Sequence, residues 1–363
     1  MKKNNFLVVG IVCFVVALLV ALLMSNKKPV EPVKPEQPKV TEQPKSDIAP
    51  HVILNNLRYT PDMQKAIKPR SLVKIPWGTE QNQVGGFNQD KEHLTEGMPW
   101  TFRALDNDKF WVLDSVNKKL KLFNKEGKCE RFIVLSEMGR NIYDFAFSKD
   151  GVFAFYNNIT GQIFLVNKDG KLVKTLNGFI TATSIEFAKD GNMLIALPTA
   201  KGKVKIAQDG QLMGIYPSNE NLSVIESDKG GLYGLNFSGK KAELTLRTGL
   251  EEKDTKVLTT INYDKPQEHE VWYTGGAIYG KDVKGNVYFA LIVCDKDGII
   301  YSDRIYRCSP DGKILGSVDV VTDPELTSGL PRNRVITPDG KVCSASYDEN
   351  SYMIYFYQIP NDK

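Results

Sequence analysis

Residues 142–176 read IYDFAFSKDGVFAFYNNITGQIFLVNKDGKLVKTL, and this stretch decides how the chain folds. It holds four strand-like runs, at 142–147, 152–156, 162–167 and 171–176, separated by the turns Lys-Asp-Gly, Ile-Thr-Gly and Lys-Asp-Gly. Short runs of β-branched and aromatic residues between glycine-containing turns are typical of β-strands joined by hairpins. The stretch therefore predicts one antiparallel unit of four strands.

The same plan recurs along the chain. A first series of turn glycines stands just before apolar runs, at Gly151, Gly191, Gly230, Gly285 and Gly340. A second series follows strand-like runs, at Gly127, Gly170, Gly210 and Gly312. Further four-strand units are expected at 100–135, 184–216, about 222–262, about 273–320 and about 332–359. Because units that repeat at this period are arranged around an axis, the sequence predicts an all-β, six-bladed β-propeller over residues 71–360.

The last unit ends after its third strand, at 352–359, so it lacks a fourth. Ser71-Leu-Val-Lys-Ile75 is a strand-like run that belongs to no unit. We expect residues 71–75 to complete the last blade and close the ring, which removes an exposed sheet edge. Residues 51–70 are expected to be a strap or lead-in segment on the outside of the propeller.

The N-terminal region predicts a membrane anchor. After a short tail, 1–5, residues 6–24 form an apolar, charge-free run, and about 19 residues at ~1.5 Å each match a hydrocarbon core of ~30 Å. A cleaved signal peptide is the alternative, but the run is longer than a usual signal core and lacks a small-x-small cleavage site. The proline-rich residues 25–50 predict an extended linker. The short tail favours a single-pass protein whose propeller lies outside the cytoplasm, on the periplasmic or extracellular side.

The charge of the chain argues against one class of partner. The formal net charge is +4, and Lys2, Lys3, Lys27 and Lys28 lie before residue 29, so the propeller region is close to neutral. A general nucleic-acid binder needs a basic surface. We therefore expect no nucleic-acid partner.

Residues 99–128 carry a family resemblance. Pro99, the Val112-x-Asp114-Ser115 step, Asn117, Phe123 and Gly127 resemble an NHL-type repeat. The second and third units keep the Asp-Gly turns without the Asp-Ser-x-Asn step. The resemblance implies a six-bladed propeller, but no activity, because this fold supports binding modules, sensors and enzymes.

A second resemblance lies just upstream. Glu96-Gly-Met-Pro-Trp100 is similar to the Glu-Gly-Pro-x-Trp segment of six-bladed lactonases of the gluconolactonase family. This resemblance implies that Glu96 helps to hold a divalent cation, such as calcium, for hydrolysis. Asn141, Asn221 and Asp348 are candidate further ligands, in contexts unlike those of the family. Because a hard cation needs several oxygens at one point, we predict no cofactor and no catalytic residue, and keep the metal-dependent lactonase as the alternative.

Other chemically active residues favour structural roles. His51, His93 and His269 show no metal-ligand spacing. Asp114, Ser115 and Asn117 are expected to cap the turn between the second and third strands of their unit. Free, buried thiols rather than a disulfide framework are expected for Cys129, Cys294, Cys308 and Cys343.

The sequence instead predicts a binding surface. Propellers bind through the loops that join one blade's last strand to the next blade's first, and two such loops are long here, at 77–98 and 263–276. Tryptophan, tyrosine and arginine anchor many interfaces. The predicted binding face comprises Trp77, Trp100, His269, Trp272, Tyr273, Arg332 and Arg334. A protein or envelope polymer is the expected partner.

Overall fold

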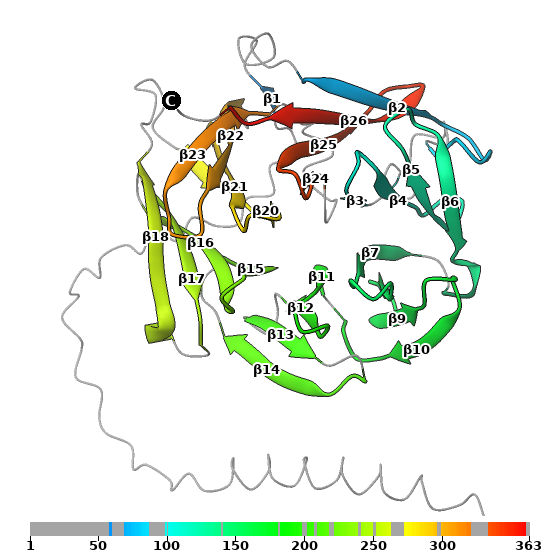
Figure 1. Cartoon of the computed structure of the whole chain (residues 1–363), viewed down its shortest axis with the longest axis horizontal. Helices are drawn as coiled ribbons and strands as arrows, with labels where there is room; N and C mark the ends of the chain where they lie inside the picture. The colour runs from blue at the N-terminus through cyan, green and yellow to red at the C-terminus, as the bar shows by residue number, and fades with distance from the viewer. Residues whose placement is uncertain are drawn as a thin grey trace, which may run out of the picture. The chain divides into compact units, whose positions relative to one another are not determined.

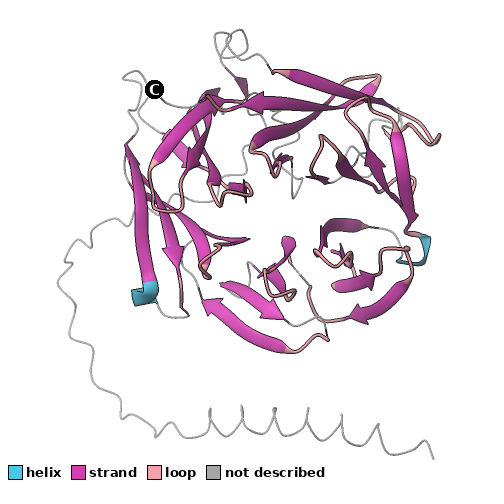
Figure 2. Cartoon of the chain, viewed as in Figure 1, coloured by secondary structure: helices cyan, strands magenta, loops and turns pink. Residues whose placement is uncertain are grey.

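A computed structural model describes residues 58–59, 69–86, 99, 101–138, 141–180, 182–197, 202–206, 209–217, 221–238, 241–249, 252–262, 272–295, 299–320 and 333–360. All of them belong to the unit His51–Lys363. They form β-strands, with two short 3-10 helices, η2 (Ser136–Met138) and η4 (Glu252–Asp254), as Figure 2 shows. No helix in this described part is long and apolar enough to cross a bilayer. The predicted span 6–24 and the linker 25–50 lie outside it.

Four consecutive antiparallel sheets follow the chain in order, each with its first strand innermost (Figure 1). The first sheet consists of β3 (Phe102–Ala104), β4 (Phe110–Asp114), β5 (Lys119–Phe123) and β6 (Cys129–Val134). The second consists of β7 (Ile142–Phe147), β8 (Phe153–Asn157), β9 (Gln162–Val166) and β10 (Leu172–Leu176). The third consists of β11 (Ser184–Phe187), β12 (Met193–Leu197), β13 (Gly202–Ile206) and β14 (Leu212–Pro217). The fourth consists of β15 (Asn221–Glu226), β16 (Leu232–Ser238), β17 (Lys241–Arg247) and β18 (Thr255–Asn262).

The last sheet joins the two ends of the described chain. It has the order β2-β26-β25-β24, with bounds β2 (Ser71–Pro76), β24 (Arg334–Ile336), β25 (Lys341–Tyr347) and β26 (Ser351–Gln358). β2 pairs antiparallel with β26 from Ser71 opposite Phe356 to Pro76 opposite Ser351. The outer strand of this sheet therefore comes from the start of the propeller, at the position predicted for residues 71–75.

The sheet between the fourth and the last departs from the expected plan. It has six strands, β1 (Arg58–Tyr59), β19 (Trp272–Gly275), β20 (Ile278–Lys281), β21 (Val287–Asp295), β22 (Ile299–Cys308) and β23 (Ile314–Asp319). β19 and β20 pair with successive parts of β21, while β23 and the parallel β1 pair with successive parts of β22. The prediction of six four-stranded blades is corrected: the described residues form five, plus this sheet. The predicted loop 263–276 is also shorter than expected, because 272–275 form β19.

Burial explains why the inner and outer strands have different sequences. β4 and β8, in the middle of their sheets, are buried at every residue, whereas the outer β6 is buried only at Cys129 and Ile133. Middle strands have neighbouring sheets on both faces and therefore read as continuous apolar runs. The core lies between sheets: one cluster joins Val73 and Ile75 of β2 to Phe102 and Phe110 of the first sheet.

The first glycine series forms the turns that follow the innermost strands. In all five, the glycine N–H donates to the carbonyl three residues earlier, at 2.9–3.1 Å. These glycines have φ values of 79–87°, a region that side chains disfavour. The repeat therefore places one tight turn at the same end of each of five innermost strands.

The second series forms turns between the last two strands of a sheet, and these turns pack against the outer strand of the preceding sheet. Gly312 has φ 102°, and its N–H donates to the Ser309 carbonyl at 3.0 Å. A methyl group added to Gly312 would lie 2.1 Å from the carbonyl oxygen of Leu258, on the outer strand of the preceding sheet. Glycine is thus required by both conformation and space.

Candidate functional site

The innermost strands enclose a cavity of about 690 Å³ at one end of the central channel. All six sheets contribute to its lining, through the ends of the innermost strands β3, β7, β11, β15, β20 and β24 and the turns that follow five of them (Figure 1). We call this cavity and its surrounding turns the channel mouth. Four basic and six acidic residues line it: Arg103, Lys149, Lys189, Lys281, Asp150, Glu186, Asp190, Glu226, Asp228 and Asp282.

Arg103 of β3 forms a charged contact in the lining of the mouth that links three sheets. Its guanidinium pairs with the Glu186 carboxylate on β11 and donates to the carbonyls of Phe145 and Ile185, the latter at 3.0 Å. Asp144 on β7 lies 3.6 Å away and accepts the Ile185 N–H at 2.9 Å. Because charge buried at this depth must be compensated, this cluster fixes the innermost strands relative to one another.

Asp228, in the turn after β15, is surrounded by lysines from three other sheets. Lys281 of β20 donates to its Oδ1 at 2.6 Å, in a pair whose side chains are 27% and 50% exposed. This hydrogen bond holds the pKa of Asp228 below its ordinary value, and the charges of Lys281, Lys189 and Lys149 add to the effect. Asp228 therefore stays ionised in mildly acidic solution.

Further hydrogen bonds join the turns of neighbouring sheets around the mouth. The Lys189 N–H donates to Glu226 Oε2 at 2.7 Å, linking the third sheet to the fourth. The Val283 N–H donates to the Pro338 carbonyl at 2.9 Å, linking the six-stranded sheet to the last. With the pair between Lys281 and Asp228, these contacts hold the turns of four successive sheets in one arrangement.

Asp282 lines the mouth but is occupied by its own turn. Its Oδ1 accepts the N–H groups of Lys284 and Asn286 at 2.9 and 3.0 Å. Its Oδ2 accepts the Asn286 amide at 2.8 Å and the Tyr288 hydroxyl at 3.0 Å. Burial, followed by the Asp282 charge, raises the pKa of Tyr288, so this hydroxyl stays a donor. Asp282 shapes the turn and is less accessible to a ligand than Asp228.

Arg334 does not lie on the predicted binding face. It is buried in β24, where its guanidinium pairs with Asp303 of β22, with one N–O distance of 2.7 Å. The same guanidinium lies 5.5 Å from the centre of the Tyr279 ring. Burial raises the pKa of the Tyr279 hydroxyl. The prediction for Arg334 was wrong because an arginine at a strand start looks the same in sequence whether it faces solvent or a buried carboxylate.

Trp77 is half-buried and belongs to a folded loop. Its indole N–H donates to the Asp348 carbonyl at 2.9 Å, and its ring lies 6.3 Å from that of Tyr352. A methyl group on Gly86 would lie 2.0 Å from the indole. Gly86 therefore lets the loop cover the tryptophan ring, which favours packing over partner contact for Trp77.

A buried ion pair holds this loop against the first sheet. Lys121 and Asp114 are both fully buried and lie 3.0 Å apart. Lys121 also donates to the Glu80 carbonyl at 3.1 Å, and Asp114 Oδ1 accepts the Gly85 N–H at 3.0 Å. Asp114 accepts both the N–H and the side-chain amide of Asn117, at 3.1 and 2.9 Å. The predicted turn cap at Asp114 and Asn117 is confirmed, and it has the added role of anchoring the loop.

The other predicted binding residues are only partly described. Trp272 and Tyr273 lie in β19, which pairs with residues 292–295 of β21. β20, which lines the channel mouth, pairs with residues 287–289, so β19 lies towards the opposite end of β21. Trp100, His269 and Arg332, together with Glu96, His51 and His93, lie outside the described residues. The described part contains no group of three or more His, Cys, Asp or Glu side chains that could hold a metal ion. Of the other candidate ligands, Asn141 is exposed, Asp348 is half-buried and Asn221 begins β15.

The four cysteines of the described chain are free and buried, as predicted. Burial raises the pKa of the Cys294 thiol to about 11 and that of the Cys308 thiol to about 12. Such thiols are poor nucleophiles near neutral pH. They act as packing groups.

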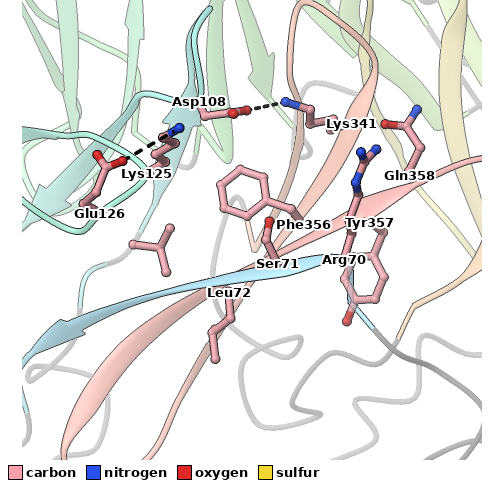
Figure 3. Close-up of a pocket in the computed structure, with 11 residues that line it drawn as sticks. Arg70, Ser71, Leu72, Asp108, Lys125, Glu126, Lys341, Phe356, Tyr357 and Gln358 are labelled. Carbon is pink, nitrogen blue, oxygen red and sulfur yellow. Dashed lines mark hydrogen bonds and ion pairs between the residues drawn. The ribbon is translucent and has the colours of Figure 1, made fainter.

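A second cavity, of about 390 Å³, lies where β2 and β26 meet the first sheet (Figure 3). Lys341 pairs there with Asp108, and with Asp339 at 3.1 Å, while Lys125 lies 3.8 Å from Glu126. The pair between Lys341 and Asp108 links the last sheet to the first, whereas the other two pairs lie within single turns. The second cavity therefore lies at the contact between the sheets that close the ring.

The channel mouth is not predicted from the sequence, although several of its residues stand in the motif that predicts the fold. Lys149-Asp150 and Lys189-Asp190 immediately precede the first-series glycines, and Asp228 occupies the same turn in the next unit. The turns were interpreted as hairpin connections alone. Their charged residues, taken together with their position after each innermost strand, were the available signal.

No family model and no curated protein sequence matches the chain. Among solved structures, it resembles a member of the DUF4221 family from Bacteroides vulgatus, with 11% identity over 81% of this chain and 98% of that one and a TM-score of 0.52. A virginiamycin B lyase from Staphylococcus aureus gives 12% identity, coverage of 78% and 99%, and a TM-score of 0.46. The calcium-binding protein regucalcin from Agrobacterium tumefaciens gives 13% identity, coverage of 72% of this chain and 92% of that one, and a TM-score of 0.41. The likeness to the Bacteroides protein concerns the propeller-type fold alone, so the NHL-type resemblance stays a prediction.

Proposed function

We propose that the chain is a ligand-binding propeller, anchored in a membrane by residues 6–24, which binds a protein or envelope polymer outside the cytoplasm. The channel mouth is its binding surface. The six-stranded sheet acts as the sixth blade. β19 and β20 together take the place of one inner strand, and β23 and β1 together take the place of one outer strand.

The observation that carries this proposal is the convergence of six innermost strands on one cavity lined by charged turns. Its volume, about 690 Å³, falls in the range of roughly 300–1,000 Å³ typical of ligand sites. Hydrogen bonds between turns of different sheets support a preformed surface. A preformed site loses less conformational entropy on binding.

The alternative, a divalent-metal-dependent lactonase, rests on the sequence around Glu96. It predicts lactone hydrolysis that requires a divalent cation and is abolished by Glu96→Gln. The binding proposal predicts no such turnover.

Site-specific cross-linking in cells tests the binding surface. A photoreactive phenylalanine derivative replaces Val283, an exposed residue of the channel mouth, Trp272 in β19, or the exposed Thr260 on the outer strand β18 of the full chain. We expect an adduct from position 283, none from 260, and loss of the adduct when Asp228→Lys is added. An adduct from position 272 alone would move the binding surface to the opposite end of the channel, and no adduct from 283 contradicts the proposal.

A further inference from the structure

We propose that the channel mouth recognises a zwitterionic ligand, a short peptide or peptide end that carries both an ammonium and a carboxylate beside apolar side chains. The inference rests on the binding function proposed above and specifies the chemistry of the ligand.

Charges of both signs line the mouth. Lys149 and Asp150 follow β7, Lys189 and Asp190 follow β11, and Asp228 follows β15, and all five line the cavity. A polyanion placed there would meet carboxylates as well as lysines, and a polycation would meet lysines as well as carboxylates. A ligand with one charge of each sign can pair with both kinds of group at once.

The pair between Lys281 and Asp228 is the part of this surface best able to exchange partners. Its side chains are 27% and 50% exposed. Arg103 and Glu186, which also line the cavity, are only 9% and 19% exposed, and Arg103 donates to two backbone carbonyls as well. A ligand carboxylate can approach Lys281, Lys189 and Lys149 while a ligand ammonium approaches Asp228. Each ligand charge then replaces a contact that the turns make with one another, so no buried charge is left unpaired.

The walls between these charges are apolar. Phe147 and Phe187 are half-buried in the lining, and Ile225, Val335 and Ile336 are buried beside them. Apolar surface of this kind favours aliphatic side chains, which gain free energy when they leave water. The volume suits a short peptide rather than a folded domain.

Isothermal titration calorimetry on the full chain in detergent, with four probes, tests this inference. The probes are Leu-Leu with free termini, N-acetyl-Leu-Leu, Leu-Leu-amide, and N-acetyl-Leu-Leu-amide. We expect the dipeptide with free termini to bind at least tenfold more tightly than each blocked form, and increasing salt to reduce this preference.

Variants connect the preference to the channel mouth. Asp228→Asn and Lys189→Gln should each reduce the affinity for the free dipeptide at least fivefold. Two matched controls, Lys229→Gln in the same turn as Asp228 and Asp311→Asn in a turn of the second series, do not line the cavity and should leave it unchanged.

The outcomes separate this inference from the proposed function. Equal binding of all four probes, or none, overturns the zwitterion inference, and so does a preference that survives both channel-mouth variants. The proposed function is judged independently by the adduct at position 283, which does not depend on these probes.

Discussion

Arg103 and Arg334 show how single charged residues define the interior of this propeller. Each lies on an innermost strand, is at least nine-tenths buried and contacts a carboxylate on a different sheet. A buried ion pair is a poor source of net stability, but removing one partner leaves a costly unpaired charge. These arginines therefore favour one arrangement of the sheets over others.

The pair between Arg334 and Asp303 allows this to be tested. Both side chains are fully buried, so Arg334→Met should destabilise the fold by about 3–5 kcal/mol. The double variant with Asp303→Leu should recover most of the loss, because neither charge remains. Urea unfolding followed by tryptophan fluorescence measures both, with the exposed Lys256→Met as control. An unchanged single variant would rule out the structural role of the pair.

Asp228 provides a prediction in pH. Its pKa is lowered chiefly by the hydrogen bond from Lys281, so its ionised form contributes stability that is present above the unfolded-state pKa and lost as pH falls through the folded-state pKa. Lys281→Met should move the Asp228 pKa back up towards the ordinary aspartate value.

Carbon-detected NMR titration of labelled aspartates measures this shift. Asp311, whose pKa is lowered first by the Ser309 hydroxyl, is the internal control and should not respond to Lys281→Met. A titration of Asp228 that is the same with and without Lys281 would contradict the proposed geometry of the channel mouth.

At the level of strands and turns, the sequence predicted most of the fold because the local signals were strong. Apolar runs bounded by glycine turns predicted β4 and β8. Glycines that adopt a positive φ, such as Gly151, form turns where the sequence predicted them. β1 was missed because a two-residue parallel strand has no periodicity. The loop prediction for 272–275 failed because Gly276 suggested a turn, whereas it provides close approach: an added methyl group there would lie 2.0 Å from the Ala290 carbonyl oxygen.

The candidate site was harder to predict than the strands. Trp77 and Arg334 were chosen as residue types that anchor interfaces, but burial and partners decide their role, and both depend on distant parts of the chain. The channel mouth is assembled from six sheets, so no local stretch contains it. The sequence alone predicts the turns, but it does not show that they lie together around one cavity.

The outer strand β2 provides a testable prediction about closure of the ring. Deleting residues 71–76 removes the ladder to β26 and the buried side chains of Val73 and Ile75, whereas deleting 25–50 shortens a linker. The first deletion should lower the melting temperature strongly, by roughly 10 °C or more. If residues 25–50 are the predicted linker, the second deletion should leave it nearly unchanged. Thermal melts followed by circular dichroism decide between them, and equal melting temperatures would show that β2 is dispensable for closure.

For the whole molecule, the function proposed here depends on where the chain is anchored. If residues 6–24 span the membrane with the propeller outside, protease added to intact spheroplasts should digest the propeller while a cytoplasmic control protein survives. Protection of the propeller, or a mature N-terminus beyond residue 24, would exclude this topology.

The central claim is that binding at the channel mouth, rather than hydrolysis or binding at the opposite end, is the activity of the chain. The most direct measurement pairs affinity for the partner captured at position 283 with divalent-dependent lactone hydrolysis, in Lys189→Glu, Trp272→Ala and Glu96→Gln variants. We predict that Lys189→Glu alone weakens affinity, by tenfold or more (about 1.4 kcal/mol), and that no variant or wild-type protein hydrolyses lactones. Metal-dependent turnover that is lost in Glu96→Gln, with an affinity indifferent to Lys189→Glu, would contradict the account.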